Sequence, residues 1–159
     1  MTEPSMARYY EDLQAGDEFL TPARTITEAD VVIYAGFSGD YNPIHTDEEF
    51  AKTTIFGRRI LHGPAVFCIA TGLVSRLGLV DGTAIAFLGM TWDLKGPVFI
   101  GDTIHVRDRV AEKRLTRKPG RGIVTFAVEI LNQRGEVVQS GQWKIMLATR
   151  DPNAQEGRE

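Results

Sequence analysis

Residues 64–77 read PAVFCIATGLVSRL, and this stretch decides the predicted fold. Apolar side chains occur almost all round the helix that the stretch predicts, which is typical of a buried helix rather than a surface one. Pro64 suits the first helical turn, where its missing N–H does no harm, and Gly78 can end the helix. A buried helix needs other elements to cover it, so the rest of the chain must supply them.

The chain after this helix predicts strands. Four segments rich in Val, Ile, Phe, Thr and Trp lie near residues 84–94, 103–115, 122–132 and 136–148. Turn signals separate them, with a tight hairpin expected at Arg134-Gly135 and a longer one at residues 118–122. The sequence therefore predicts an α+β fold, in which one buried helix is followed by an antiparallel sheet that wraps it.

Shorter elements are expected before the helix. The sequence predicts a strand at residues 18–25, a helix from the Thr27 cap to about residues 36–39, and a short helix at 47–52. Residues 40–45 are expected to form a loop, because a proline at 43 pushes the preceding residue out of the helical region. Residues 1–8 and 150–159 are polar and aperiodic, and we expect flexible tails around a single domain at 9–149.

Composition limits the function classes. A chain of 159 residues is one domain, and 18 basic against 21 acidic residues leave no electrostatic footprint for nucleic acid or an anionic membrane. The single cysteine excludes an internal disulfide and fits a reducing compartment. The N-terminus lacks a signal-peptide pattern, and the longest apolar stretch is broken by polar residues. We expect a soluble, cytoplasmic protein.

Asp40 and His45 are the first candidates for catalysis, within GDYNPIH at residues 39–45. They stand on either side of a turn that Pro43 stiffens, and such a pair can hold one water molecule and move its protons. Histidine titrates near neutral pH and can act as the base, while the acid orients or protonates. The alternative is that Asp40 caps a turn and His45 packs beside it. Asn42 favours catalysis, because its amide can fix the geometry, although Asn-Pro is also a common turn pair.

Gly63 is the second candidate, because it lies at or next to the cap of the predicted helix. Its N–H then points along a helix dipole whose positive end favours an anion, such as a thioester enolate. The alternative is that this glycine only lets two backbones approach closely. The adjacent His62 is expected to be structural. Together these parts predict addition or removal of water beside a carbonyl.

Two further features have weaker ties to chemistry. Cys68 stands one turn after Pro64 and can face the same site, although a lone cysteine in an apolar helix is usually a small buried hydrophobe. A basic run forms either a solvated hairpin tip or a site for the phosphates of a large anionic carrier: Arg114, Arg117, Lys118 and Arg121. No clustered His/Cys pattern or nucleotide-binding glycine signature occurs, so we expect neither a metal site nor a nucleotide fold.

With these residues the chain resembles the MaoC-like dehydratase family, the (R)-specific enoyl-CoA hydratases with a hot-dog fold. The matching segments are residues 39–45, Phe50-Ala51, Phe56, residues 60–63 and the turn at 95–102. The similarity runs from about residue 10 to 148. It implies a long central helix wrapped by a curved antiparallel sheet, and a homodimer or higher homo-oligomer with a substrate tunnel near the subunit interface.

The resemblance also implies reversible hydration of a trans-2-enoyl thioester, most simply a CoA ester, to an (R)-3-hydroxyacyl thioester. By position, Asp40 and His45 hold and activate the water, Asn42 supports them, and the Gly63 N–H receives the thioester oxygen. Cys68, Arg117, Lys118 and Arg121 are the further substrate-binding candidates. Neither a metal nor a redox cofactor is expected. Cys68 departs from the family, because bacterial members often carry a serine that faces the active site there.

Two rival functions stay open. Hot-dog proteins include acyl-thioester hydrolases, but those usually aim a carboxylate from the central helix, and residues 64–80 contain no Asp or Glu. The non-catalytic rival is a subunit that binds acyl thioesters without turnover. An intact set of Asp40, Asn42 and His45 argues against that rival.

Overall fold

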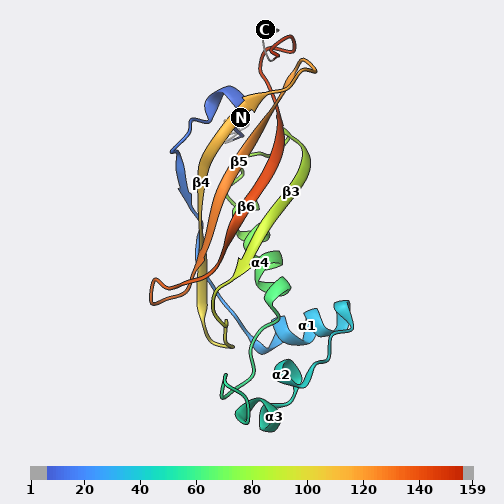
Figure 1. The fold of residues 1–159 in the computed structure, drawn as a ribbon, viewed down its shortest axis with the longest axis vertical. Helices are drawn as coiled ribbons and strands as arrows, with labels where there is room; N and C mark the ends of the chain where they lie inside the picture. The colour runs from blue at the N-terminus through green and yellow to red at the C-terminus, as the bar shows by residue number, and fades with distance from the viewer. Residues whose placement is uncertain (1–6, 156–159) are drawn as a thin grey trace, which may run out of the picture.

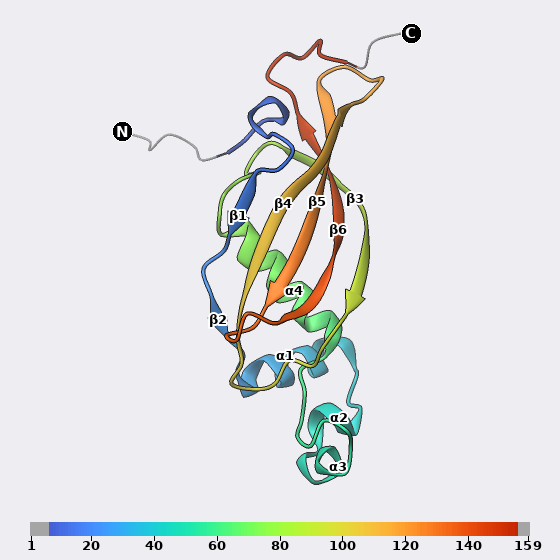
Figure 2. The same cartoon turned by 60° about the vertical axis from the view of Figure 1, so that its left-hand side comes forward.

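The computed structural model describes residues 7–155. One long helix, α4 (Gly63–Ser75), lies against a curved antiparallel sheet, and a group of short helices extends beyond the end of the sheet where α4 begins (Figures 1 and 2). The predicted α+β arrangement, with a central helix wrapped by a sheet as in the hot-dog fold, is confirmed. The sheet does not close into a barrel.

The sheet contains six strands among the described residues, in the order β1-β4-β5-β6-β3, with β2 also paired to β4. The four long strands are β3 (Ala84–Leu94), β4 (Thr103–Leu115), β5 (Arg121–Leu131) and β6 (Val137–Ala148). Their ends lie within one residue of the predicted ones. Register shifts in β3 at Phe87/Gly89 and in β4 at Val110/Glu112 bend the sheet, since a bulge increases the local twist.

The core lies between α4 and the sheet. From α4 it takes Ala65, Val66, Ala70 and Leu73, all buried. The facing side chains alternate along the strands and include Ile104, Val106, Val110, Phe126, Val128, Trp143 and Leu147. Burial of this surface, at roughly 25 cal/mol per Å² of apolar area, is the main force holding the helix in the curve of the sheet.

The elements before α4 differ from the prediction in two places. The single strand expected at 18–25 is two strands, β1 (Glu18–Leu20) and β2 (Arg24–Thr25), because Pro22 between them has no N–H for pairing. Tyr10–Asp12 form an unexpected 3-10 turn. The helix expected after Thr27 is α1 (Glu28–Ser38), and Thr27 N–H donates to Asp30 Oδ2 over 2.7 Å at its start.

The predicted loop at 40–45 was wrong in its second half. Residues Pro43–Thr46 form the short helix α2, followed by α3 (Glu48–Lys52). The proline keeps Asn42 extended, at φ −52° and ψ 132°, as expected. It also occupies the first helical position, where its fixed φ favours a helix after it. His45 therefore stands on a helical turn.

Helix α4 ends at Ser75, three residues before the predicted Gly78. It is also less enclosed than expected, since Cys68, Gly72 and Ser75 are exposed on one side. The alternative that Cys68 is a small buried hydrophobe is wrong for the described residues 7–155, in which Cys68 is exposed. Among residues 7–155 no helix is long and apolar enough to span a bilayer.

The predicted tails are described only in part. At the C-terminal end, Arg150 Nη2 donates to Asp12 Oδ2 over 2.7 Å, and Gly120 N–H donates to the carbonyl of Ala154 over 3.0 Å. Residues 1–6 and 156–159 lie outside the described residues, so the flexibility expected for them stays a prediction.

Candidate active site

Asp40 follows a sharp change of chain direction at the end of α1. Gly39 closes the helix in the left-handed region, at φ 76°, where a side chain would be strained. Its N–H donates to the carbonyl of Ala35 over 2.8 Å, and the Asp40 N–H donates to Ser38 Oγ over 3.1 Å. These bonds fix the Asp40 backbone, while its carboxylate stays exposed to solvent.

Asn42 joins Asp40 to α2. Its N–H donates to Asp40 Oδ1 over 3.1 Å, and its own Oδ1 caps α2 by accepting from the Ile44 N–H over 3.2 Å. Thr46 Oγ1 donates back to the carbonyl of Tyr41 over 3.2 Å. Asn42 thus acts on the geometry of the loop, as predicted for a supporting residue, through a backbone bond and a helix cap.

His45 is buried at 7% exposure, and a backbone carbonyl sets its tautomer. Its Nδ1 lies 2.8 Å from the carbonyl oxygen of Ile60. A carbonyl can only accept, so Nδ1 carries the proton and Nε2 keeps its lone pair. Burial lowers the pKa of His45, the Ile60 hydrogen bond opposes this, nearby His62 lowers it further, and Asp40 raises it. The net lowering favours a neutral imidazole with Nε2 available as a base.

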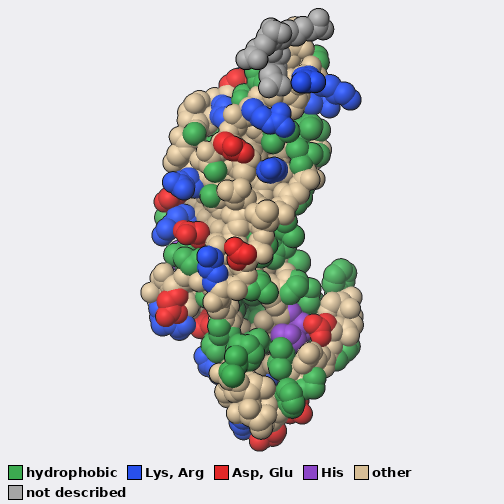
Figure 3. Space-filling model, in the orientation of Figure 1, with side chains coloured by type: hydrophobic (Ala, Val, Ile, Leu, Met, Phe, Trp, Pro, Cys, Tyr) green, Lys and Arg blue, Asp and Glu red, His purple; other side chains and the backbone are tan. Residues whose placement is uncertain are grey.

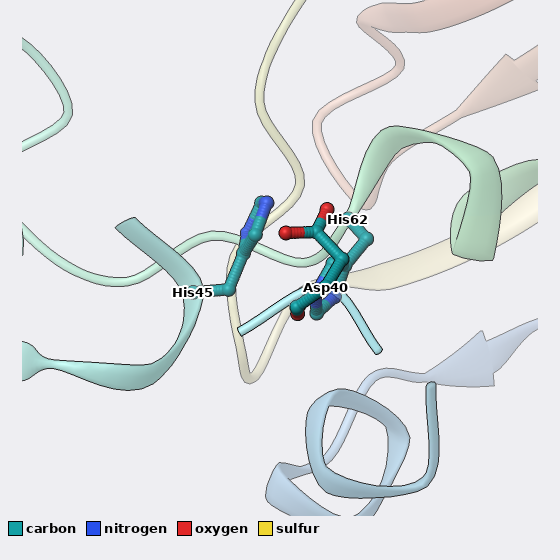
Figure 4. Close-up of side chains that lie close together, drawn as sticks. All are labelled: Asp40, His45 and His62. Carbon is teal, nitrogen blue, oxygen red and sulfur yellow. The ribbon is translucent and has the colours of Figure 1, made fainter. Parts of the chain in front are cut away.

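Asp40, His45 and His62 form one cluster. A carboxylate oxygen of Asp40 and a ring nitrogen of each histidine all lie within 4.8 Å of one another. Figure 4 shows the Asp40 carboxylate turned toward the His45 ring. Two hydrogen bonds of about 2.8 Å to one water can bridge such a gap. Asp40 is exposed, so solvent reaches the carboxylate of the cluster, whereas His45 and His62 are only 7% and 1% exposed.

Gly63 is the first residue of α4, after His62 at the cap. Among residues 7–155 its N–H has no acceptor, so it is a free donor at the positive end of the helix. A side chain at this position would be too close to Leu94, since a Cβ would lie 2.8 Å from Leu94 Cδ1. The close neighbour is therefore a side chain rather than the second backbone that the alternative expected, and the role of the Gly63 N–H as a donor to the thioester oxygen stays a prediction.

The cluster has the residue types of a metal site, but its geometry is unfavourable for one. The His45 and His62 rings stack with centroids 3.8 Å apart and planes at 28°. Stacked rings direct their in-plane lone pairs side by side rather than at one ion. His45 Nδ1 and His62 Nε2 are also engaged by carbonyls. The expectation that the site needs no metal stays a prediction, and this geometry supports it.

Two cavities flank the start of α4. One of about 600 Å³ lies between α1 and α4, with a mostly apolar lining that includes Tyr34, Phe37, Cys68 and Ile69. Its Tyr34 ring lies 4.8 Å from the His62 ring, although Asp40, His45 and His62 do not themselves line either cavity. The other, of about 330 Å³, is lined by Gly63, Leu94 and Lys95 among others. Cys68 thus faces a cavity near the site.

The basic run lies elsewhere. Arg117, Lys118 and Arg121 belong to the β4–β5 hairpin, which is at the opposite end of the sheet from α2 and α3 (Figure 1). Within one chain the structure does not bring them to Asp40. Their binding of a carrier phosphate stays a prediction that would require a second chain.

Sequence reasoning missed two contacts of the site. His62 was expected to be structural, yet its ring stacks on His45 and its Nε2 lies 2.9 Å from the backbone oxygen of Asp40. Gln139, 2% exposed, donates from Nε2 to the Gly63 carbonyl over 2.9 Å and accepts from Trp92 Nε1 over 2.8 Å. A signal was present for Gln139, since it shares the inward alternation of Trp143 and Leu147 in β6.

The family model for the MaoC-like domain matches residues 12–130. That range contains every residue of the cluster, together with Gly63. The chain belongs to the MaoC-like dehydratase family.

Individual relatives agree with this assignment. The chain is 33% identical to an (R)-specific enoyl-CoA hydratase of Rhodospirillum rubrum over 144 residues, covering 89% of the chain and 93% of that protein. It is 37% identical to Protein MaoC of Klebsiella aerogenes over 89% of the chain, but spans only 39% of that longer protein. The crystal structure of the MaoC-like dehydratase from Rhodospirillum rubrum superposes with a TM-score of 0.83, at 32% identity over 90% of this chain and 98% of that one. The chain is therefore an enzyme of the class that adds or removes water.

Proposed function

We propose that this MaoC-like protein catalyses the reversible hydration of a trans-2-enoyl thioester, most simply a CoA ester, to an (R)-3-hydroxyacyl thioester. The observation that carries the proposal is the His45 Nδ1 contact to the Ile60 carbonyl, which leaves Nε2 basic on a ring that has a nitrogen within 4.8 Å of an Asp40 carboxylate oxygen. The hydratase name of the Rhodospirillum rubrum relative supports the reaction class and its stereochemistry.

In the proposed reaction a water molecule is held between Asp40 and His45. As the pair takes one proton from the water, the oxygen attacks C3 of the double bond. Negative charge develops on the thioester oxygen, and the Gly63 N–H at the start of α4 donates to it. One such donor is typically worth about 3–4 kcal/mol of barrier. The pair then delivers the proton to C2, so the enzyme ends in its initial protonation state.

The acyl chain would occupy the cavity between α1 and α4. Its volume of about 600 Å³ and its lining of Ile33, Tyr34, Phe37 and Ile69 suit an apolar chain. The reacting double bond between C2 and C3 adjoins the thioester, so the rest of the acyl chain would extend from the cluster past Tyr34. Cys68, on the wall of this cavity, would then contact the acyl group.

A homodimer is part of this proposal. Strand β3 is at the edge of the sheet, and its apolar side chains are unusually exposed, as are those of α1 (Figure 3). The exposed set includes Ile85, Phe87, Leu88, Met90 and Leu94 on β3, with Val32, Ile33 and Phe37 on α1. A long apolar edge strand is a template for pairing with another strand. A second copy of the chain would cover this strand. We also propose a cytoplasmic location, which the single cysteine supports.

The experiment is a direct assay. Purified protein is mixed with crotonyl-CoA, and loss of the conjugated absorbance is followed, with chiral analysis of the 3-hydroxybutyryl product. His45→Ala and Asp40→Asn should each remove most of the rate without unfolding the protein. Asp47→Asn is the matched control, because Asp47 caps α3 by accepting from Phe50 N–H over 3.0 Å and is not part of the cluster.

Three results would contradict the proposal. Near-wild-type turnover in both variants would show that the residue roles are wrong. Release of free thiol with crotonyl-CoA or butyryl-CoA, measured with a thiol reagent, would indicate a thioesterase. Tight binding of the acyl-CoA without any product would indicate a binding subunit.

A further inference from the structure

His62 contacts all three parts of the proposed site. Its ring Nε2 lies 2.9 Å from the backbone oxygen of Asp40, and its ring stacks on His45 at 3.8 Å. Its peptide bond to the next residue carries the Gly63 N–H. Its own carbonyl accepts from Ala65 N–H over 3.0 Å and from Val66 N–H over 3.2 Å, which anchors that peptide to the first turn of α4.

The Asp40 carbonyl also sets the tautomer of His62. Because a carbonyl oxygen only accepts, the His62 proton lies on Nε2. Nδ1 is then a lone pair, and it is buried with no hydrogen-bond partner among residues 7–155. A buried polar atom without a partner lowers stability, so the fold retains this ring at a cost.

The ring is held from two sides. Tyr34 of α1 packs against it at 4.8 Å with the planes inclined at 46°, and His45 of α2 lies against it at 28°. The side chain is 1% exposed. A ring confined between two helices at the cap of a third cannot move without displacing the elements that carry Asp40, His45 and Gly63.

We propose that His62 is a positioning residue for the hydratase site: its Nε2–H anchors the Asp40 backbone, and its ring face holds His45 in its catalytic orientation. The inference rests on the proposed function and deepens it. His62 touches no reacting atom in this scheme and acts through its two neighbours.

Two substitutions separate the two contacts. His62→Gln retains an N–H donor at similar reach and loses the flat ring, while His62→Phe retains the ring and loses the donor. His62→Phe should lower kcat with crotonyl-CoA on the order of 10²-fold, because misplacing a catalytic group by about 1 Å has this effect. His62→Gln should retain more of kcat than His62→Phe.

The pH dependence of kcat/KM distinguishes a positioning role from a merely structural one, because a merely structural role would leave it unchanged. Two neighbouring ionisable groups, Asp40 and His62, act on the pKa of His45. The proximity of His62 lowers this pKa, and Asp40 raises it. In His62→Gln the His45 pKa should rise toward its ordinary value, and the acidic limb of the kcat/KM profile should move to higher pH. NMR titration of His45 reads the same shift without any turnover. His105→Gln, on β4, is the matched control, and it also helps to assign the three histidine signals.

Nitrogen NMR of the wild-type enzyme provides a test that needs no variant. The expected result is a proton on Nε2 and a free lone pair on Nδ1 for His62, and the opposite tautomer would overturn the inference. It would also be overturned if both folded variants kept wild-type kcat and an unchanged His45 titration. If the wild type fails to hydrate crotonyl-CoA, the proposed function fails, while the tautomer and the titration still decide the link between His62 and His45.

Discussion

The histidine pair beside α2 and the carboxyl of Asp108 in β4 are both buried ionisable groups, but their surroundings differ. His45 and His62 each present one ring nitrogen to a main-chain carbonyl, at 2.8 and 2.9 Å. Asp108 is 2% exposed on the inward face of β4, and its Oδ1 has no partner among residues 7–155. Burial without a partner raises the pKa of Asp108 to about 7.

This difference shows how two buried groups with shifted pKa values can be told apart. One belongs to an arrangement that can serve a function, and the other only lowers stability. At the histidine pair, distant backbone segments supply acceptors that select a tautomer and direct the remaining lone pair. At Asp108 only desolvation acts, and no described cavity adjoins it. A shifted pKa is therefore weaker support for function than the arrangement that produces it.

The largest expected effect contrasts the two acidic residues in catalysis. Asp40→Asn removes the carboxylate that holds water, and should lower kcat with crotonyl-CoA by about 10²–10⁴-fold, the usual contribution of an acid–base group. Asp108→Asn should leave kcat within about twofold, since Asp108 takes no part in this acid–base step. Steady-state kinetics of both variants at one pH measures this. A larger loss of kcat in Asp108→Asn than in Asp40→Asn would contradict the assignment of a purely structural cost to Asp108.

The next effect concerns stability and its pH dependence. The pKa of Asp108 rises from 3.8 to about 7 on folding, so the unfolded chain releases this proton more readily. The free energy of unfolding should therefore fall as pH rises from about 4 to about 7, and then level off. Asp108→Asn removes this titration and should stabilise the protein by roughly 2–4 kcal/mol at pH 8, with little change near pH 4.

Urea unfolding of wild type and Asp108→Asn at both pH values measures this difference directly. Equal stability differences at pH 4 and pH 8 would mean that the Asp108 carboxyl does not titrate between those values in the folded protein.

Gln139 is a third buried polar group, and unlike Asp108 it has a hydrogen-bond partner at both ends of its amide. Gln139→Leu leaves the Gly63 carbonyl and Trp92 Nε1 without their partners. We expect about 1–3 kcal/mol of lost stability, and a roughly tenfold lower kcat as the Gly63 N–H shifts. Gln142→Leu, at an exposed position of the same strand, is the control. Unchanged kcat in folded Gln139→Leu would limit Gln139 to a structural role.

The smallest effect is expected at Cys68. Its thiol lines the cavity between α1 and α4, and serine differs from it in being a stronger hydrogen-bond donor. Cys68→Ser should change kcat with crotonyl-CoA by less than about threefold and alter KM for longer acyl chains more. A panel of enoyl-CoA chain lengths provides the measurement. A large gain in kcat would show that a hydroxyl at this position takes part in the reaction.

The long elements were predictable because their signals are local. Alternation of apolar residues and clear turn residues identified the four long strands, and the apolar run after Pro64 identified α4. The helical turn at Pro43–Thr46 was missed, because the effect of Pro43 on the preceding residue was extended to the following ones. The exposure of Cys68 could not be predicted from the sequence, since it depends on which surfaces the rest of the chain leaves uncovered.

The sequence named the candidate residues, and the structure brings Asp40 and His45 together, but their geometry could not be predicted. Asp40, His45 and Gly63 were identified by a motif, whereas the bonds that orient them cross long stretches of chain. His45 reaches a carbonyl 15 residues away, His62 one 22 residues away, and Gln139 one 76 residues away. Contacts of that kind arise only when the elements pack, so the contacts of His62 with Asp40 and His45 could not be predicted from the sequence.

The carbonyl of Ile60 has a consequence for how such a site can change in evolution. It is the main chain at position 60, rather than a side chain, that determines which nitrogen of His45 is basic. Replacing Ile60 with valine or leucine keeps that oxygen in place, so substitutions there can reshape the apolar wall while the protonation pattern is inherited unchanged. Only a rerouting of the backbone, by insertion or deletion between residues 46 and 60, would erase it.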